Sequence, residues 1–170
     1  MRITNLLVVL LVFMLPSVAR AADDKPTMKS IELKNDGLVT TVTYPESEKA
    51  GEAYWITFSV LNTTKNPIYT YRKRYQDATW EIELKDYLGE SPELTKRGKI
   101  LRKDDIASPP IIINPGRTWI IKTNLARIFD LTDSPHTLDM SFHNHFFTGS
   151  EEKPETNIHV KGDSIQIQIK

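Results

Sequence analysis

The chain has 170 residues, with 22 basic and 22 acidic side chains and no cysteine. A formal net charge of zero excludes a strongly cationic nucleic-acid binder, and the absence of cysteine excludes a disulfide scaffold. A chain of this length is expected to form one domain around a single hydrophobic core.

The first 21 residues have the order of an export signal. Arg2 gives a positive start, Leu6 to Leu15 is an uninterrupted apolar run, and Ala19 and Ala21 flank Arg20 as the small residues of a cleavage site. The apolar run would span only about 15 Å as a helix, half of a hydrocarbon core, which disfavours a membrane anchor. We therefore expect cleavage after Ala21, a secreted or periplasmic protein without a membrane span, and one domain over residues 22 to 170.

From residue 28 onward, apolar residues recur at every second position, which is the periodicity of strands. Ile31 and Leu33 lead into Asp36-Gly37, a strong signal for a two-residue hairpin turn, and Leu38 to Tyr44 continues the pattern. The segment from Glu52 to Leu61 is apolar on both faces, which predicts a central strand.

The middle of the chain continues this alternation of apolar and polar residues. Trp80 to Lys85 alternates apolar with charged residues, so one of its faces is expected in the core. The polar segment from Leu88 to Ser108 is predicted to be a surface loop or a decorated hairpin. Pro109-Pro110 introduces a strand over Ile111 to Ile113 and favours a sheet edge, because proline lacks an N–H group.

The last third is predicted to contain one short turn and three further strands. Asn124 is a suitable cap for a single helical turn that ends by Leu131. Leu138 to Phe146 presents one apolar face, interrupted by Asn144. The end of the chain is predicted to be a hairpin. Its first strand contains Ile158 and Val160, its turn is Lys161 to Ser164, and its second strand is Ile165 to Ile169.

Seven to nine strands without a ten-residue amphipathic helix indicate an all-β, two-sheet sandwich. Several short stretches resemble a pattern seen in immunoglobulin-like domains of secreted proteins. These stretches are Phe58-Ser59-Val60-Leu61-Asn62, Trp80 to Leu84, Asn114-Pro115-Gly116, Asn124-Leu125 and Phe129-Asp130-Leu131. Similar stretches occur in the non-catalytic region of deuterolysin-type proteases and in the bacterial intracellular proteinase inhibitor family. The resemblance, over residues 54 to 142, implies an immunoglobulin-like sandwich and transfers no catalytic or inhibitory residue.

A basic and aromatic segment provides the candidate ligand-binding residues. On a strand, Tyr69, Tyr71 and Lys73 would share one face, and Arg72 and Arg74 the other. A second basic cluster follows in the polar segment, with Lys96, Arg97, Lys99, Arg102 and Lys103. Aromatic rings beside cations suit an anionic surface polymer or a protein partner. The alternative is a charged edge strand that resists aggregation and half-buries its tyrosines on the core side.

Catalytic and metal-binding patterns are weaker. No cysteine and no Gly-x-Ser-x-Gly elbow are present, so the sequence offers no catalytic residue. His143 and His145 would leave the same face of a strand and could bind a divalent ion, but His136 or His159 would have to come from another segment to add a ligand. A polar outer face explains the same pair without a metal, so neither a metal nor a cofactor is predicted.

The sequence therefore predicts a monomeric, exported module that binds a ligand and does no chemistry. Its ligand-binding residues would be Tyr69, Tyr71, Arg72, Lys73, Arg74, Arg97, Arg102 and Lys103. Two alternatives stay open at this point. One is a protease inhibitor, which only the family resemblance suggests, and the other is a metal-dependent enzyme centred on His143 and His145.

Overall fold

A computed structural model describes residues 26–73, 79–103, 107–132, 136–149 and 154–170. Two sheets, one of four and one of six strands, pack face to face and confirm the predicted all-β sandwich. Within these ranges there are ten strands, and β3 has only two residues. The proposed signal, residues 1 to 21, lies outside the described residues. No helix in the described ranges is long and apolar enough to cross a membrane.

The four-stranded sheet has the order β1-β2-β4-β8, and every neighbouring pair is antiparallel. Its strands are β1 (Met28–Asn35), β2 (Leu38–Pro45), β4 (Trp55–Asn62) and β8 (Thr118–Asn124). β4 lies between β2 and β8, as the apolar pattern on both of its faces predicted.

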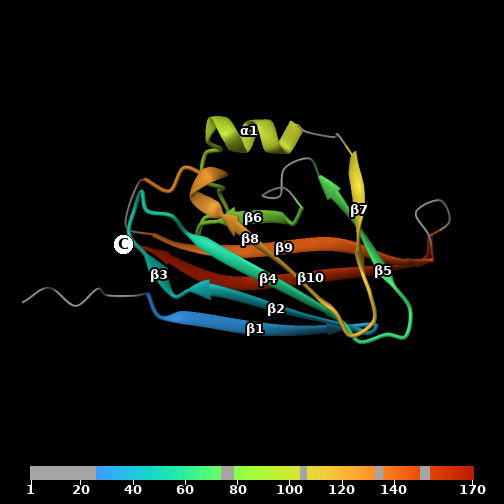
Figure 1. Ribbon diagram of the computed structural model, residues 1–170. Coiled ribbons are helices and arrows are strands. Elements are labelled where there is room, and N and C mark those ends of the chain that lie inside the picture. The colour runs from blue at the N-terminus through green and yellow to red at the C-terminus, as the bar shows by residue number, and fades with distance from the viewer. Residues whose placement is uncertain (1–25, 74–78, 104–106, 133–135, 150–153) are drawn as a thin grey trace, which may run out of the picture.

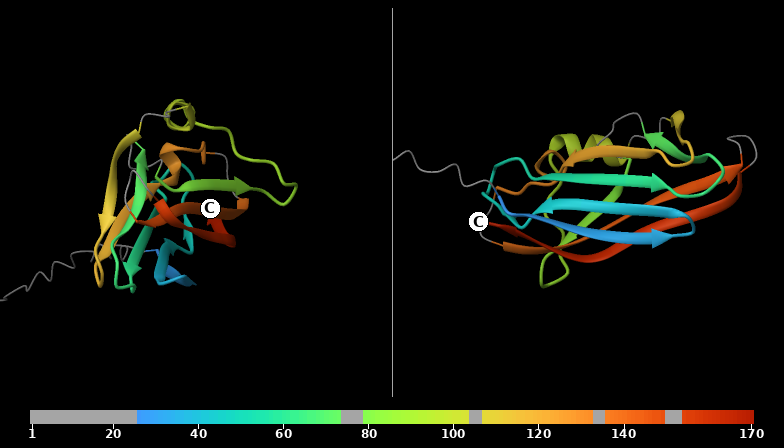
Figure 2. Two further views of the ribbon diagram at one scale, coloured as in Figure 1. Left: turned by 90° about the vertical axis from the view of Figure 1, so that its right-hand side faces the viewer. Right: turned by 60° about the horizontal axis from the view of Figure 1, so that its bottom comes forward.

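The six-stranded sheet has the order β3-β10-β9-β5-β7, and β6 pairs with another part of β9. Its strands are β3 (Ser47–Glu48), β5 (Ile68–Lys73), β6 (Glu81–Lys85), β7 (Ala107–Ile113), β9 (His136–Gly149) and β10 (Pro154–Ile169). The right-hand view of Figure 2 shows the blue-to-green strands of the first sheet lying across the long orange and red strands β9 and β10.

The core lies between the two sheets and is rich in aromatic rings. Trp80 stacks on Phe58 at 4.4 Å between ring centroids, and Phe142 meets Phe58 edge to face at 5.2 Å. The three side chains are at most 2% exposed. Phe58 belongs to one sheet and Phe142 to the other, so these contacts join the two layers.

The first hairpin forms as predicted. β1 and β2 pair from Asn35 opposite Leu38 outward, and Asp36 and Gly37 form the turn with positive φ angles of 39° and 84°. Positive φ at both turn positions matches the right-handed twist of the strands, and Asp-Gly adopts it at little cost. Two other local predictions are also confirmed: Asn124 caps a single 3₁₀ turn, η2 (Leu125–Arg127), and the proline-containing β7 is an edge strand.

The segment from Leu88 to Ser108 contains a helix that the sequence analysis missed, α1 (Lys96–Lys103), which lies beside β6 in Figure 1. The Thr95 hydroxyl accepts a hydrogen bond from the Gly98 N–H at 2.9 Å and caps the helix. Gly98 disfavours a helix by propensity, but a Cβ there would lie 2.0 Å from the Ile128 carbonyl oxygen. This close packing requires glycine, and tertiary contact outweighs propensity.

The predicted hairpin at the end of the chain is wrong. β10 is one strand of 16 residues that pairs with β9 along its length, so β9 and β10 form the hairpin. The segment after Lys161 is a bulge, where the pairing shifts between Gly162 and Ile165. Gly162 is buried opposite Phe142, and a Cβ there would lie 2.2 Å from its ring. The glycine therefore makes room for a core aromatic and does not turn the chain.

Candidate metal centre

Three histidines meet on the outer face of the six-stranded sheet. His143 and His145 belong to β9 and His159 to β10, and the register places His159 directly opposite His145. Alternate side chains leave opposite faces of a strand. The neighbours Phe142 and Phe146 are buried in the core, so the histidines of β9 face outward.

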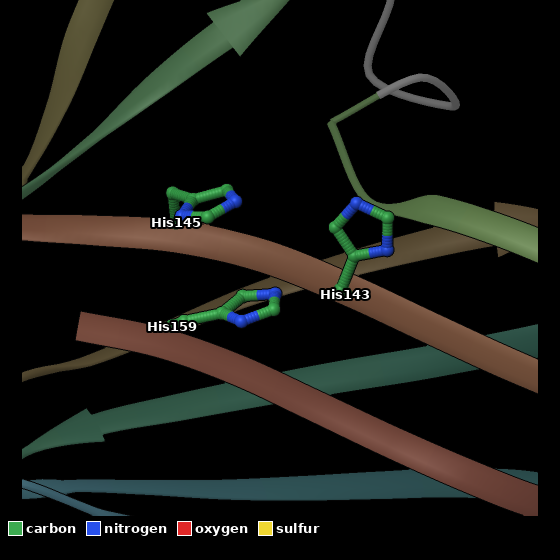
Figure 3. A group of neighbouring side chains, drawn as sticks. All are labelled: His143, His145 and His159. Atoms are coloured by element: carbon green, nitrogen blue, oxygen red, sulfur yellow. The ribbon is translucent and has the colours of Figure 1, made fainter. Parts of the chain in front are cut away.

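The three rings lie close enough to share one metal ion. One ligand nitrogen from each ring can be chosen so that all three lie within 4.8 Å of one another. The rings of His145 and His159 stack at 4.4 Å and 4°, and the His143 ring stands at 83° to that of His159 (Figure 3). Nitrogens around a tetrahedral ion lie about 3.3 Å apart, so the rings would have to rotate out of the stacked arrangement to bind one ion.

Two neighbouring oxygens orient two of these rings. Nε2 of His143 lies 3.1 Å from a carboxylate oxygen of Glu81, which is its cross-strand partner on β6. Nδ1 of His145 lies 3.2 Å from the amide oxygen of Asn157. Both oxygens are acceptors, so the histidines donate and the lone pair of the neutral ring is left on Nδ1 of His143 and on Nε2 of His145. Hydrogen bonds of this kind accompany metal-binding histidines and fix their tautomers.

The surroundings of His159 favour its neutral imidazole. Desolvation lowers the pKa of His159 below its usual value, and the electrostatic influence of His145, His143 and Lys161 lowers it further. A metal ion needs the deprotonated nitrogen, so this shift makes the ligand form available at neutral pH.

The donor set selects the kind of ion. Imidazole nitrogens suit Zn²⁺, Cu²⁺ and Ni²⁺, whereas Ca²⁺ and Mg²⁺ prefer oxygen ligands. Three protein ligands leave one position of a tetrahedral ion open to water or another donor. His136 cannot fill it, because it begins β9 and lies seven residues from His143, about 23 Å along an extended strand.

The predicted tyrosines lie on the same outer face. Thr70 of β5 is buried, and Tyr69 and Tyr71 point away from the core, where both rings contact Phe147 at 5.8 and 4.8 Å between centroids. Tyr71 is 52% exposed. β5 lies between β9 and β7, so the interpretation of this segment as an edge strand with core-facing tyrosines is wrong.

The predicted basic residues divide between two elements. Arg72 and Lys73 end β5, while Arg97, Arg102 and Lys103 belong to α1, and Arg74 lies outside the described residues. The Arg102 guanidinium donates a hydrogen bond to the Ile82 carbonyl at 2.7 Å and lies 5.9 Å from the Phe129 ring centroid, so it anchors α1 to the sandwich. Lys103 is exposed.

The two basic segments approach each other at one end of the molecule. Ala107 follows Lys103 by four residues and pairs with Lys73 across β7 and β5. The predicted ligand-binding residues therefore converge in part, although none of them belongs to the histidine cluster.

The sequence analysis named His159 only as a histidine that could add a ligand from another segment, and it missed Glu81 and Asn157. The signal was present, because His159 lies between the core residues Ile158 and Val160 and must face outward on a strand. Its pairing with β9 was hidden by the wrong hairpin assignment. No protein-family model and no curated protein matches the chain.

Proposed function

We propose that the protein is an exported, non-catalytic binding module that holds one divalent transition-metal ion through His143, His145 and His159. Zn²⁺ and Cu²⁺ are the ions that this donor set suits best. In this proposal the protein is an immunoglobulin-like sandwich with an export signal at residues 1 to 21. The metal ion is the ligand that the sequence alone did not identify.

The observation that carries the proposal is the convergence of three ligand nitrogens within 4.8 Å from two strands. Glu81 and Asn157 support it, because each places an oxygen beside one ring nitrogen, at 3.1 Å from Nε2 of His143 and at 3.2 Å from Nδ1 of His145, as the partners of metal-binding histidines do. A polar outer face needs only alternation and does not require such partners. The ordered rings therefore favour metal binding over simple solvation.

The exposure of the cluster supports binding over catalysis. His145 and His159 are exposed on the outer face of the sheet, and the described part of the chain leaves them in contact with solvent. Catalytic metal sites gain most of their effect where fixed dipoles replace water around the substrate. A site that stays in contact with solvent is better suited to taking up and releasing an ion.

Titration of the processed, tag-free protein with Zn²⁺ and Cu²⁺ tests the proposal. We expect one ion per chain by calorimetry and elemental analysis. His159→Gln should weaken binding by about 100-fold or more, because even residues that only orient ligands contribute 10- to 100-fold. His136→Gln is the matched control, since it removes a histidine from the far end of β9. Equal losses in both variants, or no stoichiometric ion in the unaltered protein, would refute the proposal.

A further inference from the structure

A hollow of about 580 Å³ opens on the sheet beside the histidine cluster. Asp139, Ser141 and Lys161 line it on the side of β9 and β10, and Lys85, Asp86 and Tyr87 line it on the side of β6 and the following loop. Ser141 precedes His143 by two residues on the same face, about 7 Å along the strand. Lys161 is the cross-strand partner of His143. The hollow and the cluster therefore adjoin.

Two lysines and two aspartates line the hollow, and their partners differ. Lys85 faces Asp139 across β6 and β9, which brings opposite charges together. The Asp86 carboxylate accepts hydrogen bonds from the backbone N–H groups of Leu88 and Glu90, at 2.8 and 2.9 Å. Lys161 is the cation of the hollow that lies beside the histidines. Glu81 and Glu83 of β6 face His143 and Ser141 at this end, and a bound dication would offset their negative charge.

We propose that this hollow holds a small organic carboxylate that completes the coordination of the ion. One carboxylate oxygen would take the position that three histidines leave open, and the Lys161 ammonium and the Ser141 hydroxyl would interact with the anion from the side of the hollow. The proposal rests on the metal site proposed above.

The size and chemistry of the hollow support a small-molecule ligand. Its volume falls within the range of 300 to 1,000 Å³ that is usual for such sites. Carboxylate oxygen is a common ligand of Zn²⁺, and an ammonium group one strand away adds a charge-assisted contact. The lining includes the Ser141 hydroxyl, the Lys161 ammonium and the Tyr87 ring, which suit an anion with a short carbon chain. Its two carboxylates have partners, because Asp139 faces Lys85 and Asp86 accepts backbone hydrogen bonds.

The test uses Co²⁺, whose visible absorption reports its coordination. Protein loaded with one Co²⁺ is titrated with acetate and then with succinate at constant ionic strength, and equilibrium dialysis confirms that the ion is retained. We expect a saturable spectral change with both anions. Lys161→Met should weaken the anion about tenfold and leave the bound Co²⁺ in place. Lys122→Met, an exposed lysine on β8 of the other sheet, is the control and should change nothing.

The outcomes separate this inference from the proposed function. Failure of the unaltered protein to bind Co²⁺ or Zn²⁺ would overturn both. A retained ion whose spectrum ignores both carboxylates would overturn only the anion site. Equal anion affinity in Lys161→Met and in the unaltered protein, or binding of equal strength to the metal-free protein, would also overturn it.

Discussion

The first and the last hairpins of the chain carry similar glycine signals and use them differently. Gly37 has a φ of 84° and turns the chain between β1 and β2. Gly162 lies outside the left-handed region, in the middle of β10, where it leaves space for the Phe142 ring. A glycine thus marks a local interruption, but the residue packed against it decides whether the chain turns or continues.

This difference matters for function because only the last hairpin carries the histidine cluster. A turn at Lys161 to Ser164 would have paired the segment around His159 with Ile165 to Ile169. The bulge instead keeps β10 continuous, and His159 lies opposite His145. The proposed metal site therefore depends on a backbone irregularity three residues away from His159.

Of the substitutions considered in the two hairpins, replacement of Gly162 should have the largest effect on stability. Gly162→Ala places a methyl group 2.2 Å from the Phe142 ring, in the core, where overpacking costs about 2 to 3 kcal/mol. Urea denaturation should show this loss in the free energy of unfolding. Zn²⁺ binding should also become weaker, because β10 must shift beside His159.

Gly37→Ala provides the matched variant in the first hairpin. It must adopt positive φ and its Cβ meets the Thr64 methyl group at 2.3 Å, and Thr64 is a half-exposed side chain whose hydroxyl donates hydrogen bonds to Asn62 and Asn66. The loss should be about 1 to 2 kcal/mol, with unchanged metal affinity. A larger loss in Gly37→Ala than in Gly162→Ala would contradict the proposed role of the bulge.

The end of the first hairpin can be tested through a buried hydrogen bond. The Tyr54 hydroxyl donates to the Pro45 carbonyl at the end of β2, and Tyr54 is fully buried. Tyr54→Phe should reduce the free energy of unfolding by about 1.5 kcal/mol at pH 8, because the carbonyl loses its partner. Tyr87→Phe, with a side chain 89% exposed, should have no effect.

The same hydroxyl gives a pH dependence of known sign. Burial raises the pKa of Tyr54, and the nearby Tyr44 and Glu48 raise it further. Above pH 10 the unfolded chain loses this proton and the folded protein retains it, so stability decreases as the pH rises. The decrease between pH 8 and pH 11 should be smaller in Tyr54→Phe. An identical alkaline slope in both proteins would show that Tyr54 does not contribute.

The smallest change in stability should come from Glu81, whose carboxylate lies 3.1 Å from Nε2 of His143 in the proposed metal site. Glu81→Ala removes the acceptor that orients the His143 ring, and we expect about a tenfold loss in Zn²⁺ affinity with unchanged stability. Glu83→Ala, on the same face of β6, is the control. Calorimetric titration measures the Zn²⁺ affinity of both variants. Equal affinities would show that Glu81 does not contribute to the site.

Much of the fold follows from local pattern. Alternation identified β4, β6 and β9, Asp36-Gly37 identified the first turn, and Asn124 identified the cap of η2. These features need only the residues within one element. The helix α1 and the bulge in β10 depend on the contacts of Gly98 with Ile128 and of Gly162 with Phe142, which join segments distant in sequence.

Only part of the site could be predicted from the sequence, for the same reason. His143 and His145 share a face by spacing alone. Their relation to His159, Glu81 and Asn157 depends on strand pairing, which alternation does not specify, because any strand of suitable polarity can be placed beside β9. The choice of partner is a property of the whole core.

The location of the three histidines on paired strands also sets how quickly an ion can come and go. Hydrogen-bonded backbone fixes the three Cα positions in advance, so loading requires only rotation of exposed side chains, which takes nanoseconds or less. Among the residues that the structure describes, none covers His145 or His159, which are exposed. The proposed site would therefore exchange its ion readily and would be suited to buffering or handing over an ion rather than to keeping it permanently.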